Sequence, residues 1–366
     1  MAYIRKTDDN SANAILSGNA GKIEYKLDDA NDSLRLSFTS GGSDLRLNAV
    51  TGIDAEIDLA EILESIPLKT VPVNAGSLIE VDSVTISRFR NNPGIQIDSL
   101  QESLYFNVIK GHIFREGTRS GEYTNILTKR VLTQREQISI TYKAFPELVS
   151  VFCDNTAGGA TFSATITAYR NNGNVSSILL GSISPASGCY IWTVQAGYNS
   201  IRTLVSNPSN VTGWKITFSR SSTTIGWIRF NLGKVQYRAR CFAFRNDLGG
   251  IDMIHSLGDF RCLPKYQPRV FVNDGHSKVL KSNPATEYEV ESGPVVNAVQ
   301  REKWKAFLRS REKYIWTLAD QFGSTPEFVP IILTDASPKL TDWELNSVTF
   351  KFRPEYERGG RIYQHE

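Results

Sequence analysis

Short runs in which apolar and polar residues alternate make up most of the chain. Residues 33–38 and 44–49 alternate strictly, and Ser40-Gly-Gly-Ser43 stands between them. A period of two places every second side chain on the same face, which is typical of a strand with one buried side. Two such runs around a glycine turn predict a hairpin. Because similar runs recur along the sequence, we expect a mainly β protein made of several antiparallel, β-sandwich-like domains.

Two stretches have the helical period instead. The first covers about residues 58–66, where Asp58 can cap the first turn and Pro67 stops the last one. The second covers about residues 296–311, where large apolar side chains such as Trp304 share one face. We therefore expect a short N-terminal helix and one longer C-terminal helix among the strands.

Composition divides the chain into three parts. Residues 146–233 are rich in Ser, Thr, Asn and Gly, and their strand-like runs recur at the spacing of roughly 8 to 12 residues that is typical of a β-sandwich. The parts on either side carry more charge. The sequence thus predicts an N-terminal β domain (1–145), a middle β-sandwich (146–233) and a C-terminal β domain with one helix (234–366).

Charge and hydropathy narrow the classes of partner. The 366 residues include 41 Lys and Arg against 38 Asp and Glu, a formal net charge of +3. So small and dispersed an excess makes no case for nucleic-acid binding. No run approaches the roughly 18 to 20 apolar residues of a membrane span, and the N-terminus lacks the apolar core of a signal peptide. We expect synthesis in a cytoplasm, no membrane insertion and no nucleic-acid partner.

Residues that carry chemistry are sparse. The four cysteines are widely spaced, so buried thiols are favoured over a Cys153–Cys189 bridge. Asp252, His255 and Asp259 could converge on a metal ion, but the first two should point to opposite faces of one strand. No nucleotide-binding or hydrolase motif is present. The sequence predicts no catalytic residue, cofactor or metal and hence no enzyme, and nothing selects a glycan-degrading activity.

Aromatic residues of the middle part allow two interpretations. Aromatic side chains among Asn, Ser and Thr can stack on sugar rings, but at a period of two they can equally fill the core of the sandwich. The candidates for glycan contact are Tyr190, Trp192, Tyr198 and Trp214; Tyr169 and Trp227 belong to the same group of aromatics.

A hairpin at residues 236–255 separates the middle part from the C-terminal part. Phe242 and Phe244 add apolar side chains to the second face of its first strand, so that strand should be covered on both sides. Gly249 and Gly250 predict a tight turn. We expect an assembly or packing hairpin that contacts the C-terminal helix or a neighbouring subunit.

The same hairpin carries a resemblance to a known class of proteins. An aromatic strand runs into Asn, then Gly-Gly, then a second strand, and three other segments occur in the matching order: residues 16–19, 127–134 and 328–335. Together they resemble virion proteins of tailed bacteriophages that infect Bacteroidetes. The chain departs from this pattern at Ala20, where proline is usual, and at Ile251, where an aromatic residue is usual.

The resemblance implies a structural role in a virion. It implies a subunit of the tail or of the tail-tip or baseplate region, made in the host cytoplasm and assembled into a homo-oligomeric ring. Its partners would then be copies of itself and other tail proteins. The alternative is a carbohydrate-binding adhesin or receptor-binding protein that contacts a host-surface glycan through the middle sandwich.

Overall fold

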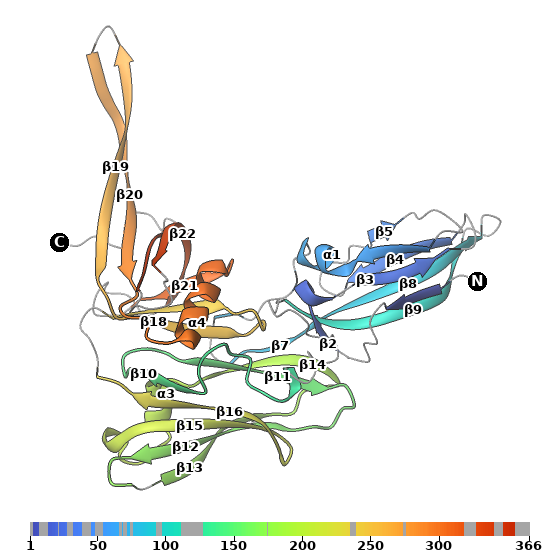
Figure 1. The fold of residues 1–366 in the computed structure, drawn as a ribbon, viewed down its shortest axis with the longest axis horizontal. Coiled ribbons are helices and arrows are strands. Elements are labelled where there is room, and N and C mark those ends of the chain that lie inside the picture. The colour runs from blue at the N-terminus through green and yellow to red at the C-terminus, as the bar shows by residue number, and fades with distance from the viewer. Residues whose placement is uncertain are drawn as a thin grey trace.

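Five β-sheets make up most of the described part of the computed structural model, as the alternating pattern predicts. The structure describes residues 3–6, 14–20, 22–27, 32–38, 45–47, 54–65, 68, 72–73, 76–92, 97–110, 127–173, 175–234, 239–273, 276–317, 327–339 and 347–355. Within these ranges the strands form three bodies that meet near the centre of the molecule (Figure 1). The prediction of a mainly β fold with several sheets is confirmed.

The N-terminal body contains two sheets and a short helix. One sheet has the order β2 (Ala14–Leu16), β9 (Ile97–Ile109), β8 (Asp82–Asn92), β4 (Asp32–Phe38), β5 (Leu45–Leu47); the other has the order β1 (Tyr3–Lys6), β3 (Lys22–Lys26), β6 (Asp54–Asp58). Strands β4 and β5 pair as the predicted hairpin, with Leu34 opposite Leu47. Helix α1 (Leu59–Ser65) follows β6, and Asp58 Oδ1 accepts from the N–H groups of Ala60 and Glu61, as expected of a cap. Residues Ser17–Asn19 form a short 3-10 turn, η1.

The middle body is a sandwich of a five-stranded and a three-stranded sheet. The larger sheet has the order β10 (Ile138–Thr141), β16 (Thr223–Leu232), β15 (Val211–Arg220), β12 (Phe162–Arg170), β13 (Val175–Ile183). The smaller has the order β11 (Leu148–Asn155), β14 (Gly188–Gln195), β7 (Leu78–Glu80), and the short helices α3 (Tyr198–Arg202) and η2 (Pro208–Asn210) join β14 to β15. The predicted boundary at residue 145/146 is wrong in one respect, because β7 and β10 precede it in sequence and yet belong to the sandwich.

The C-terminal body is a seven-stranded sheet with one helix. Its order is β18 (Ile251–Ser256), β17 (Arg240–Arg245), β21 (Lys313–Trp316), β22 (Phe328–Lys339), β23 (Ser347–Pro354), β20 (His276–Glu291), β19 (Phe260–Asn273). Helix α4 (Ala298–Arg309) lies within the predicted 296–311 and is capped by Asn297, whose side chain accepts from Gln300 N at 2.8 Å. The observed helix is shorter at both ends because Asn297 and Ser310 take non-helical backbone angles.

One hydrophobic cluster joins the three bodies. It contains Leu16 and Ile109 from the N-terminal body, Phe152 from the sandwich, and Cys241 and Met253 from the C-terminal sheet. Apolar surface buried between bodies stabilises their arrangement in the same way as a domain core. The junction therefore holds the bodies together, and the polar groups within it form the first candidate site.

Candidate functional site

The turn between β17 and β18 is fastened by the buried side chain of Asn246. Its amide nitrogen donates to the carbonyl oxygen of Leu132 at 2.9 Å and to Asp252 Oδ2 at 3.0 Å. Its Oδ1 accepts from the backbone N–H groups of Leu248 and Gly250 at 3.0 and 3.1 Å. Since every polar atom of this buried amide has a partner, the turn has one fixed position against the segment that precedes β10.

The two glycines of this turn are required by contacts between bodies. Gly249 has φ of +79°, and a Cβ there would lie 2.4 Å from Ile109 Cγ2 of the N-terminal body. A Cβ on Gly250 would lie 2.4 Å from the carbonyl oxygen of Leu132. The tight turn predicted from the sequence is present. Because its two glycines have no side chain, two other segments can also approach the backbone there.

A buried ionic cluster lies beside the turn and links the sandwich to the C-terminal sheet. Arg135 binds Glu147 through Nη1 and Asp252 through Nε, the latter at 3.2 Å, and all three side chains are almost fully buried. His255 Nε2 lies 3.2 Å from the other oxygen of Glu147. Because β18 is the edge strand of its sheet, Arg135 can reach Asp252 and the Glu147–His255 pair around that edge.

Neutral donors complete the environment of the two carboxylates. Thr141 Oγ1 donates to Glu147 at 2.6 Å, and Gln134 N donates to Asp252 Oδ2 at 2.8 Å. Thr133 Oγ1 donates to Asp252 Oδ1 at 2.5 Å. A buried carboxylate needs hydrogen-bond donors of this kind if it is to remain ionised.

The cluster shifts the pKa values of its members. Burial alone would raise the pKa of Glu147, but the positive charge of Arg135, with contributions from His255 and the Thr141 hydrogen bond, lowers it to about 2. Burial lowers the pKa of His255 despite the neighbouring Glu147. Burial also lowers the pKa of Lys303, on α4, to about 8, and Arg135 adds to this shift. Glu147 is thus held as a carboxylate, whereas His255 is biased towards the neutral ring.

The predicted packing hairpin contacts the C-terminal helix of its own chain. Phe242 and Phe244 are fully buried, and their ring centroids lie 5.7 and 5.6 Å from that of Phe307 on α4. Phe242 also meets Phe350 and Phe352 of β23 at 5.4 and 5.8 Å. The sequence predicted contact with either the C-terminal helix or a neighbouring subunit. The helix covers these two rings, which form part of the core of the C-terminal body.

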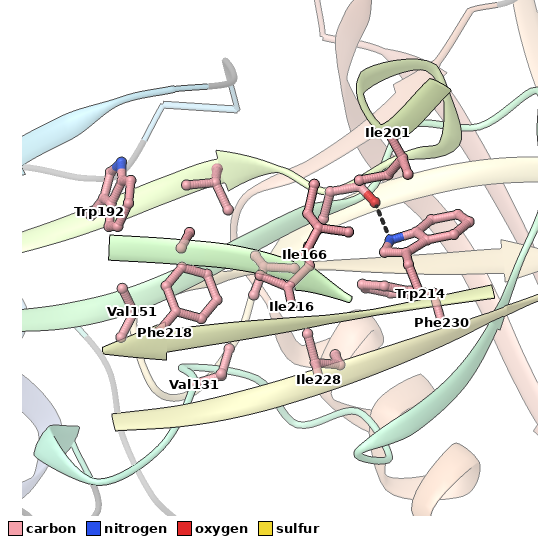
Figure 2. Close-up of a cluster of buried hydrophobic side chains, with 14 of the residues drawn as sticks. Val131, Val151, Ile166, Trp192, Ile201, Trp214, Ile216, Phe218, Ile228 and Phe230 are labelled. Carbon is pink, nitrogen blue, oxygen red and sulfur yellow. Dashed lines mark hydrogen bonds between the residues drawn. The ribbon is translucent and has the colours of Figure 1, made fainter. Parts of the chain in front are cut away.

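The glycan-contact prediction is wrong for three of its four residues, because their rings are buried. Trp192, Tyr198 and Trp214 are 5%, 8% and 0% exposed and belong to the sandwich core. Trp214 Nε1 donates to the carbonyl oxygen of Ala196 at 2.9 Å (Figure 2). No sugar ring can reach a face that is packed in this way.

Three other aromatic residues of the group are partly accessible. Tyr190 is half-buried at the edge of the core and stays a prediction for glycan contact. Tyr169 and Trp227, both half-buried as well, stand on the opposite face of the larger sheet from the core.

The second candidate site is a long arm. Strands β19 and β20 pair from Phe260 opposite Val290 to Asn273 opposite His276. Only residues Tyr288–Glu291 of β20 also pair with β23. Beyond that base the two strands project as a ribbon from the body of the molecule (Figure 1). An alternating pattern of residues cannot show that two paired strands leave their sheet.

The described residues show no metal centre and no disulfide. Within them, no group of three His, Cys, Asp or Glu side chains is placed to hold a metal ion. Asp252 is engaged by Arg135, and Asp259 pairs with Arg261 at 3.4 Å. All four cysteines are free; three are buried as predicted, whereas Cys262 is exposed on β19. No described helix is long and apolar enough to cross a membrane.

Comparison with known proteins adds little. No protein-family model and no curated protein matches the chain. Among the solved structures that match is a chain described as the virion of a native gene transfer agent particle, at a TM-score of 0.24 and 9% identity. The match covers 34% of this chain and 96% of that chain. Similarity at that level carries no argument about fold or function.

Proposed function

We propose that this chain is a structural subunit of a virion of the tailed-phage type, and that it assembles with copies of itself into a ring in the tail or tail-tip region. The observation that carries the proposal is the β19–β20 arm. Two features support a non-catalytic role: Arg135, Glu147 and Asp252 are paired with one another and with neutral donors, and they are buried at a junction rather than open to a substrate.

The arm is an element that a neighbouring subunit would stabilise. Among the strands that the structure describes, each residue of β19 from 264 to 273 pairs only with β20, over about 33 Å of extended chain. An isolated two-stranded ribbon is marginally stable in water, because it buries little apolar surface and leaves both outer edges unpaired. A neighbouring subunit that pairs with an edge or covers a face of the arm would remove both costs.

A closed ring satisfies this need for every copy. When each subunit gives its arm to the next, the interface is heterologous and repeats until the ring closes, so no arm is left unpaired. The buried junction between the bodies would keep the arm at a fixed angle, as a ring of defined size requires. Other tail proteins would then contact the faces of the ring.

Light scattering after size-exclusion chromatography, combined with negative-stain images, tests the proposal. We expect a discrete ring-shaped oligomer from the purified full chain and the same protein in virions of the source phage. A strictly monomeric protein that is absent from virions would refute it.

A further inference from the structure

The outer face of the five-stranded sheet has an unusual charge pattern. This face, which we call the outer sheet face, is the side of β10, β16, β15, β12 and β13 that points away from the sandwich core. It forms the outermost layer of the middle body in Figure 1. The five strands contain four basic residues and no Asp or Glu. Residues 146–233 as a whole contain five basic and two acidic side chains, and Glu147, one of the two, is buried at the junction.

Two cations stand directly opposite each other on this face. Lys215 of β15 pairs with Arg229 of β16 in the antiparallel register, so their side chains are neighbours. No carboxylate among the described residues pairs with either of them. Like charges placed directly across two strands repel each other, so the arrangement costs stability unless an anion lies between them.

Aromatic rings border the two cations. The Arg229 guanidinium lies 4.4 Å from the ring centroid of Tyr169, and its Nε donates to Asn231 at 3.2 Å. The Lys215 ammonium lies 5.7 Å from the ring centroid of Trp227. These contacts orient the guanidinium and leave its two terminal amino groups without a partner in the described part of the chain. A guanidinium fixed in this way presents the fork geometry that matches a carboxylate.

The remaining positions are short and polar. Thr167 lies opposite Lys215, and Thr217 lies opposite Trp227, so hydroxyl groups flank both cations. Hydroxyl and amide groups beside an aromatic ring suit the hydroxyl groups and apolar ring face of a sugar. A nucleic acid would call for a longer track of cations along its phosphates than this pair supplies.

We propose that the outer sheet face binds an acidic saccharide. A carboxylate of the sugar lies between Arg229 and Lys215, and the sugar ring packs against Trp227. The earlier candidates, Trp192 and Trp214, fill the core behind the sheet that carries this site. The proposal does not rest on ring assembly, since it concerns a face that the arm does not form.

Calorimetric titration of the purified full chain tests the site, with oligogalacturonate as the acidic probe and maltohexaose as the neutral one. We expect oligogalacturonate to bind and maltohexaose to bind at least about tenfold more weakly, because only the former supplies a charge-assisted contact. Added salt should weaken the binding of oligogalacturonate. Absence of oligogalacturonate binding, or equal binding of the two probes, would overturn the proposal.

Matched variants locate the site. Arg229→Gln and Trp227→Ala should each weaken oligogalacturonate binding at least about tenfold. Arg202→Gln removes an exposed arginine of the same body on α3 and should leave binding unchanged. Equal binding by Arg229→Gln and the parent chain would contradict the site. So would tighter binding of single-stranded DNA than of oligogalacturonate.

A second copy is the other occupant that this face could accept, because Ile138, Ile140, Val175 and Leu179 are exposed near its two edges. Light scattering on Trp227→Ala and Arg229→Gln separates the two cases. An unchanged oligomer supports the saccharide site, and a dissociated oligomer would overturn it in favour of a subunit interface. Ring assembly and saccharide binding can therefore fail independently.

Discussion

At the scale of single residues, the junction between the three bodies depends on buried ion pairs. Arg135 and Glu147 are separated by 12 positions in sequence, and Asp252 lies more than 100 positions further on. No motif marks any of them, and alternation alone gives no reason to pair them. The sequence identified Asp252 and His255 only as an unconvincing metal site, and the partners that explain them became evident from the fold.

Removal of one charge from this cluster should destabilise the protein strongly. Glu147→Gln leaves Arg135 buried beside a neutral amide, and a broken buried ion pair typically costs about 3–5 kcal/mol of unfolding free energy. Glu302→Gln is the matched control, since Glu302 pairs with Lys305 at the surface and should contribute less than about 1 kcal/mol. Urea unfolding measures both. Equal losses in the two variants would contradict the importance of the buried cluster.

The turn glycines allow backbone strain to be separated from crowding. Gly159→Ala places a Cβ at φ of +75° in open space and should cost about 1–2 kcal/mol through strain alone. Gly249→Ala has nearly the same φ but also drives a Cβ against Ile109, so its cost should be clearly larger. Thermal unfolding of both variants makes the comparison. Similar losses would show that the N-terminal body does not press on this turn in solution.

A pair of tryptophans tests which aromatics form the core. Trp214→Ala removes a fully buried ring and its hydrogen bond and should cost about 3–5 kcal/mol. Trp227→Ala removes a ring on the outer sheet face and should change stability by about 0.5 kcal/mol. Chemical denaturation gives both values. If Trp227→Ala proved the more destabilising, the assignment of the two sheet faces would be wrong.

At the scale of elements, the period of the sequence located most strands and both predicted helices. Alternation identified β4 and β5 as a hairpin, and the helical stripe around Trp304 identified α4. The same signal could not show which sheet a strand joins. Strand β7 comes from the N-terminal part, yet it pairs with β14 through Tyr190 opposite Glu80, because long-range pairing depends on surfaces that form only when the chain folds.

Protonation of His255 should loosen the contact between the sandwich and β18. Burial lowers its pKa below the ordinary 6.5, so the folded state binds this proton less readily than the unfolded state does. The stability that neutral His255 contributes is fully present above pH 6.5. It is lost as the pH falls from 6.5 through the lowered pKa. Glu147 adds a further loss between its ordinary pKa of 4.5 and about 2.

Melting temperatures measured from pH 7.5 to 5 test this dependence. The parent chain should lose stability below pH 6.5, and His255→Gln should flatten the curve in that window. Glu302→Gln, which removes a surface carboxylate paired with Lys305, is the control and should follow the parent chain. A parent chain whose melting temperature does not change in this range would show that His255 does not control the junction.

At the scale of the whole molecule, three bodies packed around one junction hold a projecting arm in place. The junction cluster brings together residues from all three bodies, so each body restricts the others. Composition predicts three parts along the chain, but an arm that leaves its sheet has the same alternation as strands that remain within one. Only the register of β20 with β23, which ends at Tyr288, shows where the arm begins.

The most direct test of assembly is the mass of the particle formed with and without the arm. In the shortened chain an Asn-Gly turn joins Lys265 to Ala285, which face each other in the β19–β20 register, so the base of the sheet is kept. Light scattering should show a discrete oligomer for the full chain and a monomer for the shortened one. A cooperative thermal transition of the shortened chain should show that this monomer is folded. If the shortened chain formed the same oligomer as the full chain, the arm would not be the element that joins the subunits.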